Sequence, residues 1–256
     1  RNFPEQGFYV FSAPETVRVL IEPCMPKYPP VGLFIVGTDT EVGKTYVTAL
    51  IAKHLHDAGK RVGVYKPVAS DCYDDGDQVI SEDALTLWHA AGQPGTFNDV
   101  CPQKFRAPLA PHLAARAEGK ELDSDLMRTG LEKWASGYDI VLVEGVGGLM
   151  TPVSDSEYVA DLAFEFGFPI LVVAPNVLGV INQTLQTLIT AAAFENGLNV
   201  SGIILNNIQF QERDISVKTN RQEIEKRTST PILAEIPYNA DELPVEIDWI
   251  RLATRA

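Results

Sequence analysis

Apolar and polar positions alternate regularly from residue 31 to about residue 240. Six short runs rich in valine and isoleucine are apolar at successive positions, namely Gly32–Val36, Arg61–Tyr65, Asp139–Val143, Pro169–Ala174, Val200–Leu205 and Pro231–Ile236. Stretches with helical periodicity separate them, near Lys44–Ala58, Glu82–Ala91, Ser124–Ala135, Val159–Phe166, Ile181–Phe194 and Ile215–Arg227. Strands that are apolar on both faces and alternate with helices predict an α/β fold, a doubly wound and mostly parallel sheet.

The first 30 residues differ from this pattern. They hold six prolines and one extended patch at residues 16–21. We therefore predict an N-terminal arm over residues 1–30, with one short strand, followed by a single domain over residues 31–256. Such an arm can be structural or can serve as an interaction segment, and both interpretations stay open.

Charge and length restrict the possible partners. The 256 residues include 34 acidic and 21 basic side chains, which give a net charge of −13. This balance argues against nucleic-acid binding, which favours a basic face, but it is compatible with a small phosphorylated ligand. No apolar run reaches the roughly 18 residues that span a bilayer, and no signal-peptide core follows the first residues. We expect a cytoplasmic protein with no membrane partner.

Cysteine usage agrees with this expectation. Cys24, Cys72 and Cys101 are far apart in the sequence. Their spacing fits neither a zinc site nor a disulfide framework. We interpret them as isolated reduced thiols.

The segment after the first predicted strand carries the clearest chemistry. Residues 37–45 read Gly-Thr-Asp-Thr-Glu-Val-Gly-Lys-Thr and lead into a predicted helix. In a strand, loop and helix of this kind, loop amides and the helix N-terminus converge on a phosphate. Gly43 allows close backbone approach, Lys44 can reach the β- and γ-phosphates, and Thr45 offers a hydroxyl to Mg²⁺. The segment predicts a P-loop that binds ATP and magnesium.

The loop departs from the common P-loop in two ways. Five residues, rather than four, separate Gly37 from Gly43. Partition-type ATPases carry a lysine five residues before the P-loop lysine, where this chain has Asp39. The second departure argues against a switch that partitions DNA or membrane.

Further candidates follow other predicted strands, because ligands of open α/β sheets gather at the carboxyl ends of the strands. Lys66 ends the second strand and precedes Pro67. Glu144 directly follows an apolar strand and opens a glycine-rich stretch, Gly145 to Gly148. Mg²⁺ takes oxygen ligands from one or two carboxylates, phosphates and water. Thr45, Glu144 and one more acid would satisfy it.

Two asparagine-containing segments have functional and structural interpretations. Residues 176–182 open a helix whose N-terminus suits a carboxylate, yet it can equally be an ordinary helix start. Asn206 and Asn207 follow a strand, where an amide can contact an adenine edge or cap a turn.

Together these motifs resemble dethiobiotin synthetases. The resemblance covers about residues 31–240 and is carried by the P-loop, Lys66-Pro67-Val68, Asp83 in its helix, Glu144 to Gly148 and Asn206, with Phe105 to His112 similar to that family's central segment. It implies a P-loop NTPase fold and a substrate, 7,8-diaminopelargonic acid, whose amine takes up CO₂ as a carbamate. ATP would then phosphorylate the carbamate, and the second amine would close the ureido ring and release phosphate.

The resemblance also implies roles for single residues. Lys66 and Lys44 would be the catalytic cations, with Thr40, Glu41 and Ser70 on the diamine and phosphate side. The metal ligands would be Thr45, Asp83 and Glu144. The nucleotide would also be bound by Val42, Gly43, Gly145, Val146, Gly147, Asn206, Asn207, Pro237, Tyr238 and Asn239. In a homodimer, Gly179, Val180 and Asn182 of the partner subunit would bind the substrate carboxylate.

Two other functions compete with this interpretation. A related ATP-dependent amidotransferase would require a glutaminase region, which the sequence does not show. A partition-type ATPase would require the additional lysine and a basic face or a terminal amphipathic helix, and Asp39 and the net charge of −13 oppose it.

Overall fold

The central sheet has six parallel strands. A computed structural model describes residues 28–29, 31–209 and 214–254. The strand order is β10-β9-β8-β1-β7-β2, with every neighbouring pair parallel. The strands are β1 (Gly32–Gly37), β2 (Val62–Tyr65), β7 (Ile140–Gly148), β8 (Ile170–Pro175), β9 (Val200–Asn206) and β10 (Ile232–Ile236). The predicted α/β class, the parallel sheet and its six strands are confirmed.

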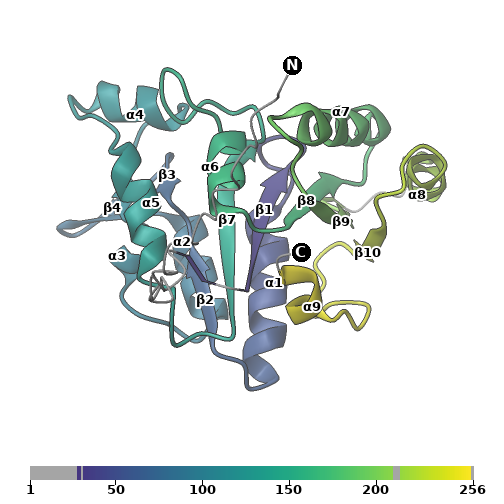
Figure 1. The fold of residues 1–256 in the computed structure, drawn as a ribbon, viewed down its shortest axis with the longest axis horizontal. Helices are drawn as coiled ribbons and strands as arrows, with labels where there is room; N and C mark the ends of the chain where they lie inside the picture. Colours follow the sequence, from purple (N-terminus) through teal and green to yellow (C-terminus); the bar gives the residue numbers. More distant parts are fainter. Residues whose placement is uncertain (1–27, 30, 210–213, 255–256) are drawn as a thin grey trace, which may run out of the picture.

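Helices lie on both sides of the sheet (Figure 1). The predicted ones are α1 (Lys44–Asp57), α2 (Glu82–Ala90), α5 (Ser124–Glu132), α6 (Val159–Phe166), α7 (Val180–Ala193) and α8 (Val217–Glu225). Their existence is confirmed, but α5 ends at Glu132 rather than at Ala135. The reason is that Trp134 and Ala135 donate to carbonyls three residues back, a tighter turn than the α-helix.

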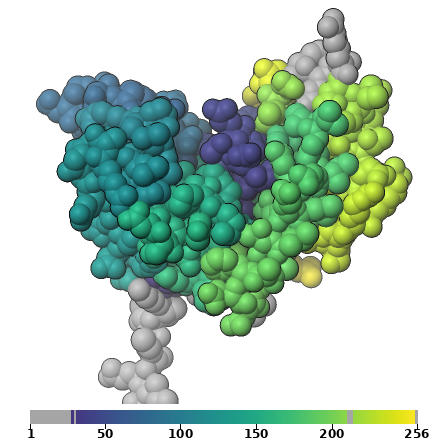
Figure 2. All heavy atoms as spheres, turned by 90° about the horizontal axis from the view of Figure 1, so that it is seen from above, coloured from purple at the N-terminus to yellow at the C-terminus, as the bar shows by residue number. Residues whose placement is uncertain are grey.

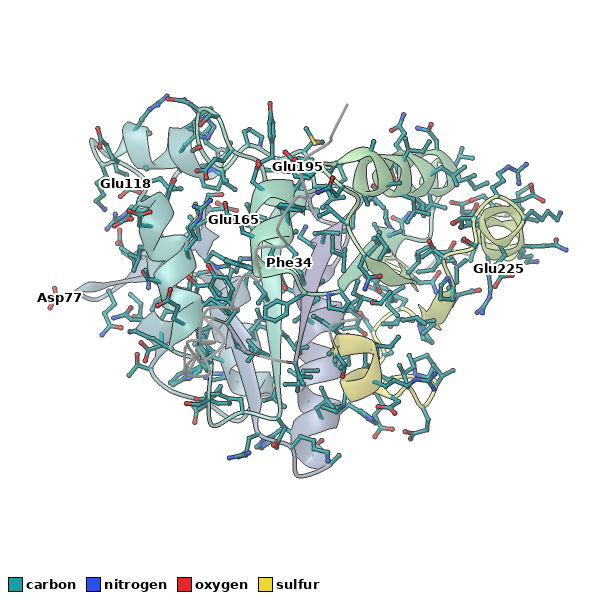
Figure 3. The ribbon with its side chains drawn as sticks, viewed as in Figure 1. Phe34, Asp77, Glu118, Glu165, Glu195 and Glu225 are labelled. Atoms are coloured by element: carbon teal, nitrogen blue, oxygen red, sulfur yellow. The ribbon has the colours of Figure 1, made fainter. Side chains whose placement is uncertain are left out.

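The central strands are buried on both faces, and their side chains form the core. Every residue of β1 and β8 is buried, and α1 buries Val47, Ile51 and Leu55 against the sheet. Phe34 lies in the middle of the molecule in Figure 3, whereas the labelled acidic side chains Asp77 and Glu225 lie at its outside. The apolar runs of the sequence thus become a core that covers β1 completely.

Several short elements were not predicted. They are β3 (Val68–Ala69) paired with β6 (Gln103–Lys104), the hairpin β4 (Tyr73–Asp75) and β5 (Gln78–Ile80), and the helices α3 (Phe97–Val100), α4 (Pro111–Ala117) and α9 (Trp249–Ala253). Pieces of two to seven residues are too short to show periodicity. Proline at the first turn of α4 is nevertheless a recognised helix start.

The strand order places one edge of the sheet at a switch point. From β1 the chain goes to β2, returns to β7 beside β1, and then crosses to the other side of β1 to form β8. Ligands of doubly wound sheets bind outside the carboxyl ends of the strands at such a reversal. A ligand is therefore expected at the loops after β1, β7 and β8.

The predicted arm lies almost entirely outside the described residues, including its extended patch at residues 16–21. Tyr28, at its end, is buried and packs edge-on against the Phe166 ring, with 5.2 Å between ring centroids. Across the described part of the chain, no helix combines the length and apolar character needed to span a bilayer.

Candidate active site

The P-loop wraps the carboxyl end of β1 and leads directly into α1. Gly43 has φ +87°, a left-handed conformation, and a Cβ there would lie 2.2 Å from the side-chain amide nitrogen of Asn206. Both facts require glycine at this position. The Asn206 amide donates to the Val42 carbonyl at 3.1 Å. The loop is thus held from the neighbouring end of β9.

Lys44, at the first position of α1, is buried beneath this loop. Its ammonium donates to the Asp39 carbonyl at 3.2 Å. Lys44 thus lies against the backbone of the loop that precedes α1. Val42 points into the core, so its expected contact with the nucleotide is limited to its backbone.

Lys66, Asp83 and Glu144 meet in one ionic cluster. The Lys66 ammonium lies 2.5 Å from Asp83 Oδ2 and 2.6 Å from Glu144 Oε1. The Thr45 hydroxyl donates to the same Glu144 Oε1 at 2.8 Å. Lys66 is 3% exposed and Glu144 0%, whereas the Asp83 side chain is 51% exposed. Four residues from α1, α2, β7 and the end of β2 thus form one site.

Glu144 differs from its predicted position. It lies inside β7, paired in register with Ile35 of β1, and the strand continues through the glycines to Gly148. The expectation that the strand ends at Val143 is wrong, because backbone pairing with β1 resumes between Gly37 and Gly148 after an irregularity. Burial inside the strand fixes the Glu144 carboxylate more firmly than a loop would.

The charges of the cluster shift its pKa values in opposite directions. Burial by itself lowers the pKa of Lys66, but the Glu144 and Asp83 carboxylates outweigh burial and raise it above its usual range. Burial raises the pKa of Asp83, and the Lys66 ammonium outweighs this and lowers it. Burial lowers the pKa of Lys44, with Glu144 opposing this and Lys66 adding to it. Lys66 is therefore a permanent cation at neutral pH.

A cavity of about 770 Å³ opens above the cluster. Ten of the expected site residues line it, namely Thr40, Glu41, Gly43, Lys44, Thr45, Lys66, Ser70, Asp83, Val146 and Gly147. Figure 2 shows the corresponding face hollowed between the teal and the green parts of the chain, with purple spheres of the earliest described residues in the hollow. The geometry thus brings ten of the 21 predicted site residues together around one space.

Part of the cavity wall was missed by sequence reasoning. Residues 108–111, Tyr46, Asp71 and Thr151 also line the cavity. Thr151 accepts from the Gly148 amide at 2.9 Å, so it fixes the end of the glycine-rich stretch. A Cβ on Gly147, which has φ +63°, would lie 2.4 Å from the Thr151 hydroxyl. Only the resemblance of residues 105–112 to a known segment pointed to any of this wall.

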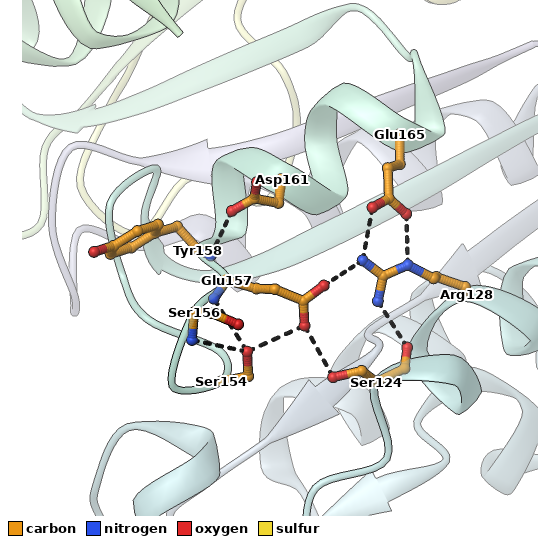
Figure 4. A network of polar contacts seen from close by, with 8 residues as sticks. All are labelled: Ser124, Arg128, Ser154, Ser156, Glu157, Tyr158, Asp161 and Glu165. Carbon is orange, nitrogen blue, oxygen red and sulfur yellow. Dashed lines mark hydrogen bonds and ion pairs between the residues drawn. The ribbon is translucent and has the colours of Figure 1, made fainter. Parts of the chain in front are cut away.

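The loop that carries Thr151 is anchored to α5 (Figure 4). Arg128 forms two contacts with Glu165, at 2.5 and 2.7 Å, and its Nη2 donates to Glu157 Oε1 at 2.6 Å. The other oxygen of Glu157 accepts from the hydroxyls of Ser124 and Ser154. A bidentate arginine with further partners is a firm, geometrically specific anchor. It holds the far end of the loop that begins at the glycine-rich stretch.

The residues expected at adenine lie at the adjoining strand ends. Ile236 of β10 pairs with Asn206 of β9, which brings the exposed segment Pro237, Tyr238 and Asn239 to the edge where β9 ends. Asn206 Oδ1 is buried and has no hydrogen-bond partner among the described residues. Asn207 is engaged structurally, because its side chain donates to the Ile236 carbonyl at 2.8 Å. None of these residues lines the 770 Å³ cavity.

The start of α7 is held by a network of asparagines. Asn220 of α8 donates to Asn176 Oδ1 at 2.9 Å and to the Val177 carbonyl at 3.2 Å. Asn176 donates in turn to Asn207 Oδ1 at 3.2 Å. The loop between β8 and α7 is thus linked to the end of β9.

The residues expected at the substrate carboxylate lie just beyond this network. Gly179 is the left-handed residue before α7, Val180 is buried and Asn182 is exposed. They do not line the cavity of their own chain. The Asp214 carboxylate accepts from the neighbouring Leu178 amide at 3.2 Å, so an acidic group already stands beside this helix start.

Solved structures with a similar fold belong to nucleotide-binding proteins. The signal recognition particle receptor FtsY of Elizabethkingia anophelis, in complex with GDP, matches with a TM-score of 0.51 at 14% identity, over 89% of this chain and 64% of that one. A ParA family ATPase of Chlorobium tepidum matches with a TM-score of 0.50 at 17% identity, over 82% and 85%. These matches concern the fold alone.

Proteins found by sequence comparison share a higher identity with this chain than the solved structures do. A family model described as an AAA domain matches residues 31–244. A protein of Rhodopirellula baltica named ATP-dependent dethiobiotin synthetase BioD is 42% identical over 223 residues, which are 83% of this chain and 86% of that protein. A protein of the same name from Akkermansia muciniphila is 36% identical over 218 residues, 85% of this chain and 97% of its own length.

The parallel sheet with a phosphate loop at its central strand defines the chain as a P-loop NTPase. Within this class, the family follows from the loop sequence, the ionic cluster and the relatives. The chain belongs to the dethiobiotin synthetase family.

Proposed function

We propose that this protein uses ATP to join CO₂ to 7,8-diaminopelargonic acid and to close the ureido ring of dethiobiotin, a step of biotin biosynthesis. The observation that carries the proposal is the cavity that joins the P-loop to Lys66, Asp83 and Ser70. The names of the relatives agree with it. The reaction class is that of an ATP-dependent cyclo-ligase.

Phosphate binding follows from the loop and the buried lysine. The amides before α1 and the Lys44 ammonium converge where the β- and γ-phosphates of ATP would lie. Thr40 and Glu41 are exposed at the cavity rim and would contact the transferring phosphoryl group and the diamine. Asn206 would accept from the adenine amino group through its unpaired Oδ1, with Pro237 to Asn239 beside the base.

Thr45, Asp83 and Glu144 fit a magnesium ion. The Thr45 hydroxyl oxygen and Glu144 Oε1 are 2.8 Å apart, close to the roughly 3.0 Å between adjacent ligands of an octahedron with bonds of about 2.1 Å. The buried Glu144 Oε2 has no hydrogen-bond partner in the described part of the chain. Bound there, Mg²⁺ would neutralise charge on the ATP phosphates. No group of three or more histidine, cysteine or acidic side chains in the described residues offers another centre.

The chemistry needs positioning and charge rather than a covalent enzyme intermediate. An amine of the substrate takes up CO₂ and loses a proton, which gives a carbamate anion. A carbamate oxygen attacks the γ-phosphorus, and the bond to ADP breaks. The second amine then attacks the carbonyl carbon, and phosphate leaves as the ring closes. Lys66, which lines the cavity, would stabilise the carbamate and the transferring phosphoryl group.

A homodimer would complete the site. Gly179, Val180 and Asn182 stand outside the cavity of their own chain, at a helix N-terminus that suits a carboxylate. We therefore propose that a partner subunit presents this helix start to the substrate carboxylate. We also propose a cytoplasmic location, because the proposed reaction uses ATP and bicarbonate.

A phosphate-release assay tests the proposed function against its rival. We expect fast ATP turnover only when the diamine and bicarbonate are both present. Turnover stimulated instead by DNA or by lipid vesicles would favour a partition-type switch and refute the synthetase.

A further inference from the structure

The ammonium of Lys66 lies where two expected metal ligands meet. It contacts Asp83 Oδ2 at 2.5 Å and Glu144 Oε1 at 2.6 Å while its own side chain is 3% exposed. These carboxylates come from α2 and β7, which are distant in the sequence. A single buried cation thus pairs with both.

Glu144 Oε1 is the atom at which Lys66 and the expected metal ion would meet. Glu144 Oε1 accepts from Lys66 at 2.6 Å and from the Thr45 hydroxyl at 2.8 Å. A Mg²⁺ ion bonded to this oxygen at about 2.1 Å would stand beside the ammonium, and two adjacent cations in a buried site repel strongly. The ion and the Lys66 ammonium therefore compete for Glu144 Oε1.

We propose that Lys66 makes the metal site select the metal–nucleotide complex over the free metal ion. This inference rests on the proposed function. In the nucleotide-free protein, Lys66 serves as counter-ion to Asp83 and Glu144. A free ion would have to displace a buried ammonium that pairs with no other carboxylate among the residues described, which is costly.

Nucleotide changes this balance. ATP phosphates and the carbamate supply new anionic partners for Lys66 on the cavity side, where Lys66 already lines the wall. The metal ion can then take over Asp83 and Glu144, and every buried charge keeps a partner. Lys66 therefore determines when the metal binds, in addition to its catalytic role.

Binding of Mn²⁺ alone, without nucleotide, tests this directly. Free Mn²⁺ is counted by electron paramagnetic resonance in titrations of the wild type, Lys66→Met and Lys66→Gln. We expect both variants to bind Mn²⁺ at least about tenfold more tightly than the wild type, because the Lys66 ammonium no longer competes for the two carboxylates. Far-UV circular dichroism verifies folding. The same gain in an apolar and in a polar replacement would show that it comes from the lost charge and not from local packing.

Lys44→Met is the matched control. It removes the same charge from the same cavity, but the Lys44 ammonium donates to the Asp39 carbonyl rather than to a carboxylate. We expect a clearly smaller gain in Mn²⁺ affinity. Equal affinities for the Lys66 and Lys44 variants, or no gain over the wild type, would overturn the inference.

A second titration separates this failure from that of the proposed function. The wild type is titrated with Mn²⁺ in the presence of a non-hydrolysable ATP analogue, and we expect tight binding. Binding there, with no gain in the Lys66 variants alone, would refute only the role of Lys66. An absence of binding even with the analogue would refute the metal site itself, and this inference with it.

Discussion

Two buried lysines supply the positive charge at the phosphate loop, and their partners differ. Among the described residues, the Lys44 ammonium forms one hydrogen bond, to the Asp39 carbonyl, and burial lowers its pKa. Lys66 contacts two carboxylates, which raise its pKa. An arriving phosphate would thus give Lys44 an anionic partner, since no ion pair joins it to a carboxylate in the described part of the chain.

Replacement of Lys44 tests this assignment. We expect Lys44→Ala to lower kcat/KM by about 100-fold or more and to weaken nucleotide binding, because a point charge on the phosphates is lost. Phosphate release and calorimetric ATP binding measure both effects. Lys53→Ala is the control, since Lys53 lies on the same helix but is exposed and paired with Asp57. Near-normal turnover of the Lys44 variant would refute the P-loop assignment.

Replacement of Glu144 tests the metal ligand. We expect Glu144→Gln to stay folded and to need several-fold more Mg²⁺ for half-maximal activity, because one anionic ligand becomes neutral. Activity is measured across a magnesium titration. Glu82→Gln serves as control, because Glu82 neighbours Asp83 but bonds to the Tyr73 hydroxyl. If the titration curve of Glu144→Gln matches that of the wild type, Glu144 is structural.

At this scale the sequence indicated the chemistry but not the contacts. Lys66 was identified from its position after a strand, yet its pairing with Asp83 and Glu144 joins residues 17 and 78 positions apart. Thr151 was missed altogether, because its place on the cavity wall depends on the Gly148 amide. Such contacts exist only once the sheet has formed.

Elements of the central sheet were predictable because each is long and apolar enough to show its period. The sequence did not predict strand boundaries or short strands that depend on pairing with distant segments. The apolar run ends at Val143, but pairing between Gly37 and Gly148 extends β7 through the glycine-rich stretch. The two-residue strands β3 and β6 exist only because Val68 and Ala69 meet Gln103 and Lys104.

The loop between β8 and α7 depends on α8 for its position. Asn220 is 2% exposed and supplies hydrogen bonds to Asn176 and to Val177. We expect Asn220→Ala to lower the free energy of unfolding by about 1–3 kcal/mol. We also expect it to raise the KM for the diamine roughly tenfold with a smaller change in the KM for ATP.

Denaturant unfolding and steady-state kinetics with each substrate varied provide the measurements. Gln222→Ala, at an exposed position of the same helix, is the control. An equal rise in both KM values would show that the network supports the fold generally and does not position α7.

At the scale of the whole molecule, the cavity proposed for the substrate does not include the start of α7. The cavity lies between the P-loop and residues 108–111, whereas the start of α7 stands apart from it. A long substrate with a terminal carboxylate would extend beyond what one chain encloses. This is why a second subunit enters the account, in a symmetric pair.

Subunit mixing tests the shared site. Lys66→Ala and Asn182→Asp should each be inactive, the second because its charge repels the substrate carboxylate. After subunit exchange, a one-to-one mixture should regain about a quarter of the wild-type activity, since half the dimers are mixed and each has one intact site. Light scattering confirms the dimers. A mixture that stays as inactive as its parents would contradict the shared site.

The most direct test of the central claim is the mass of the product. Diaminopelargonate, ¹³C-labelled bicarbonate, Mg²⁺ and ATP are incubated with the protein, with CTP and GTP in parallel reactions. The account predicts a product that has gained one labelled carbon and one oxygen and lost two hydrogens, formed one for one with ADP and phosphate. Hydrolysis of ATP without this product, or no reaction at all by the folded protein, would contradict it.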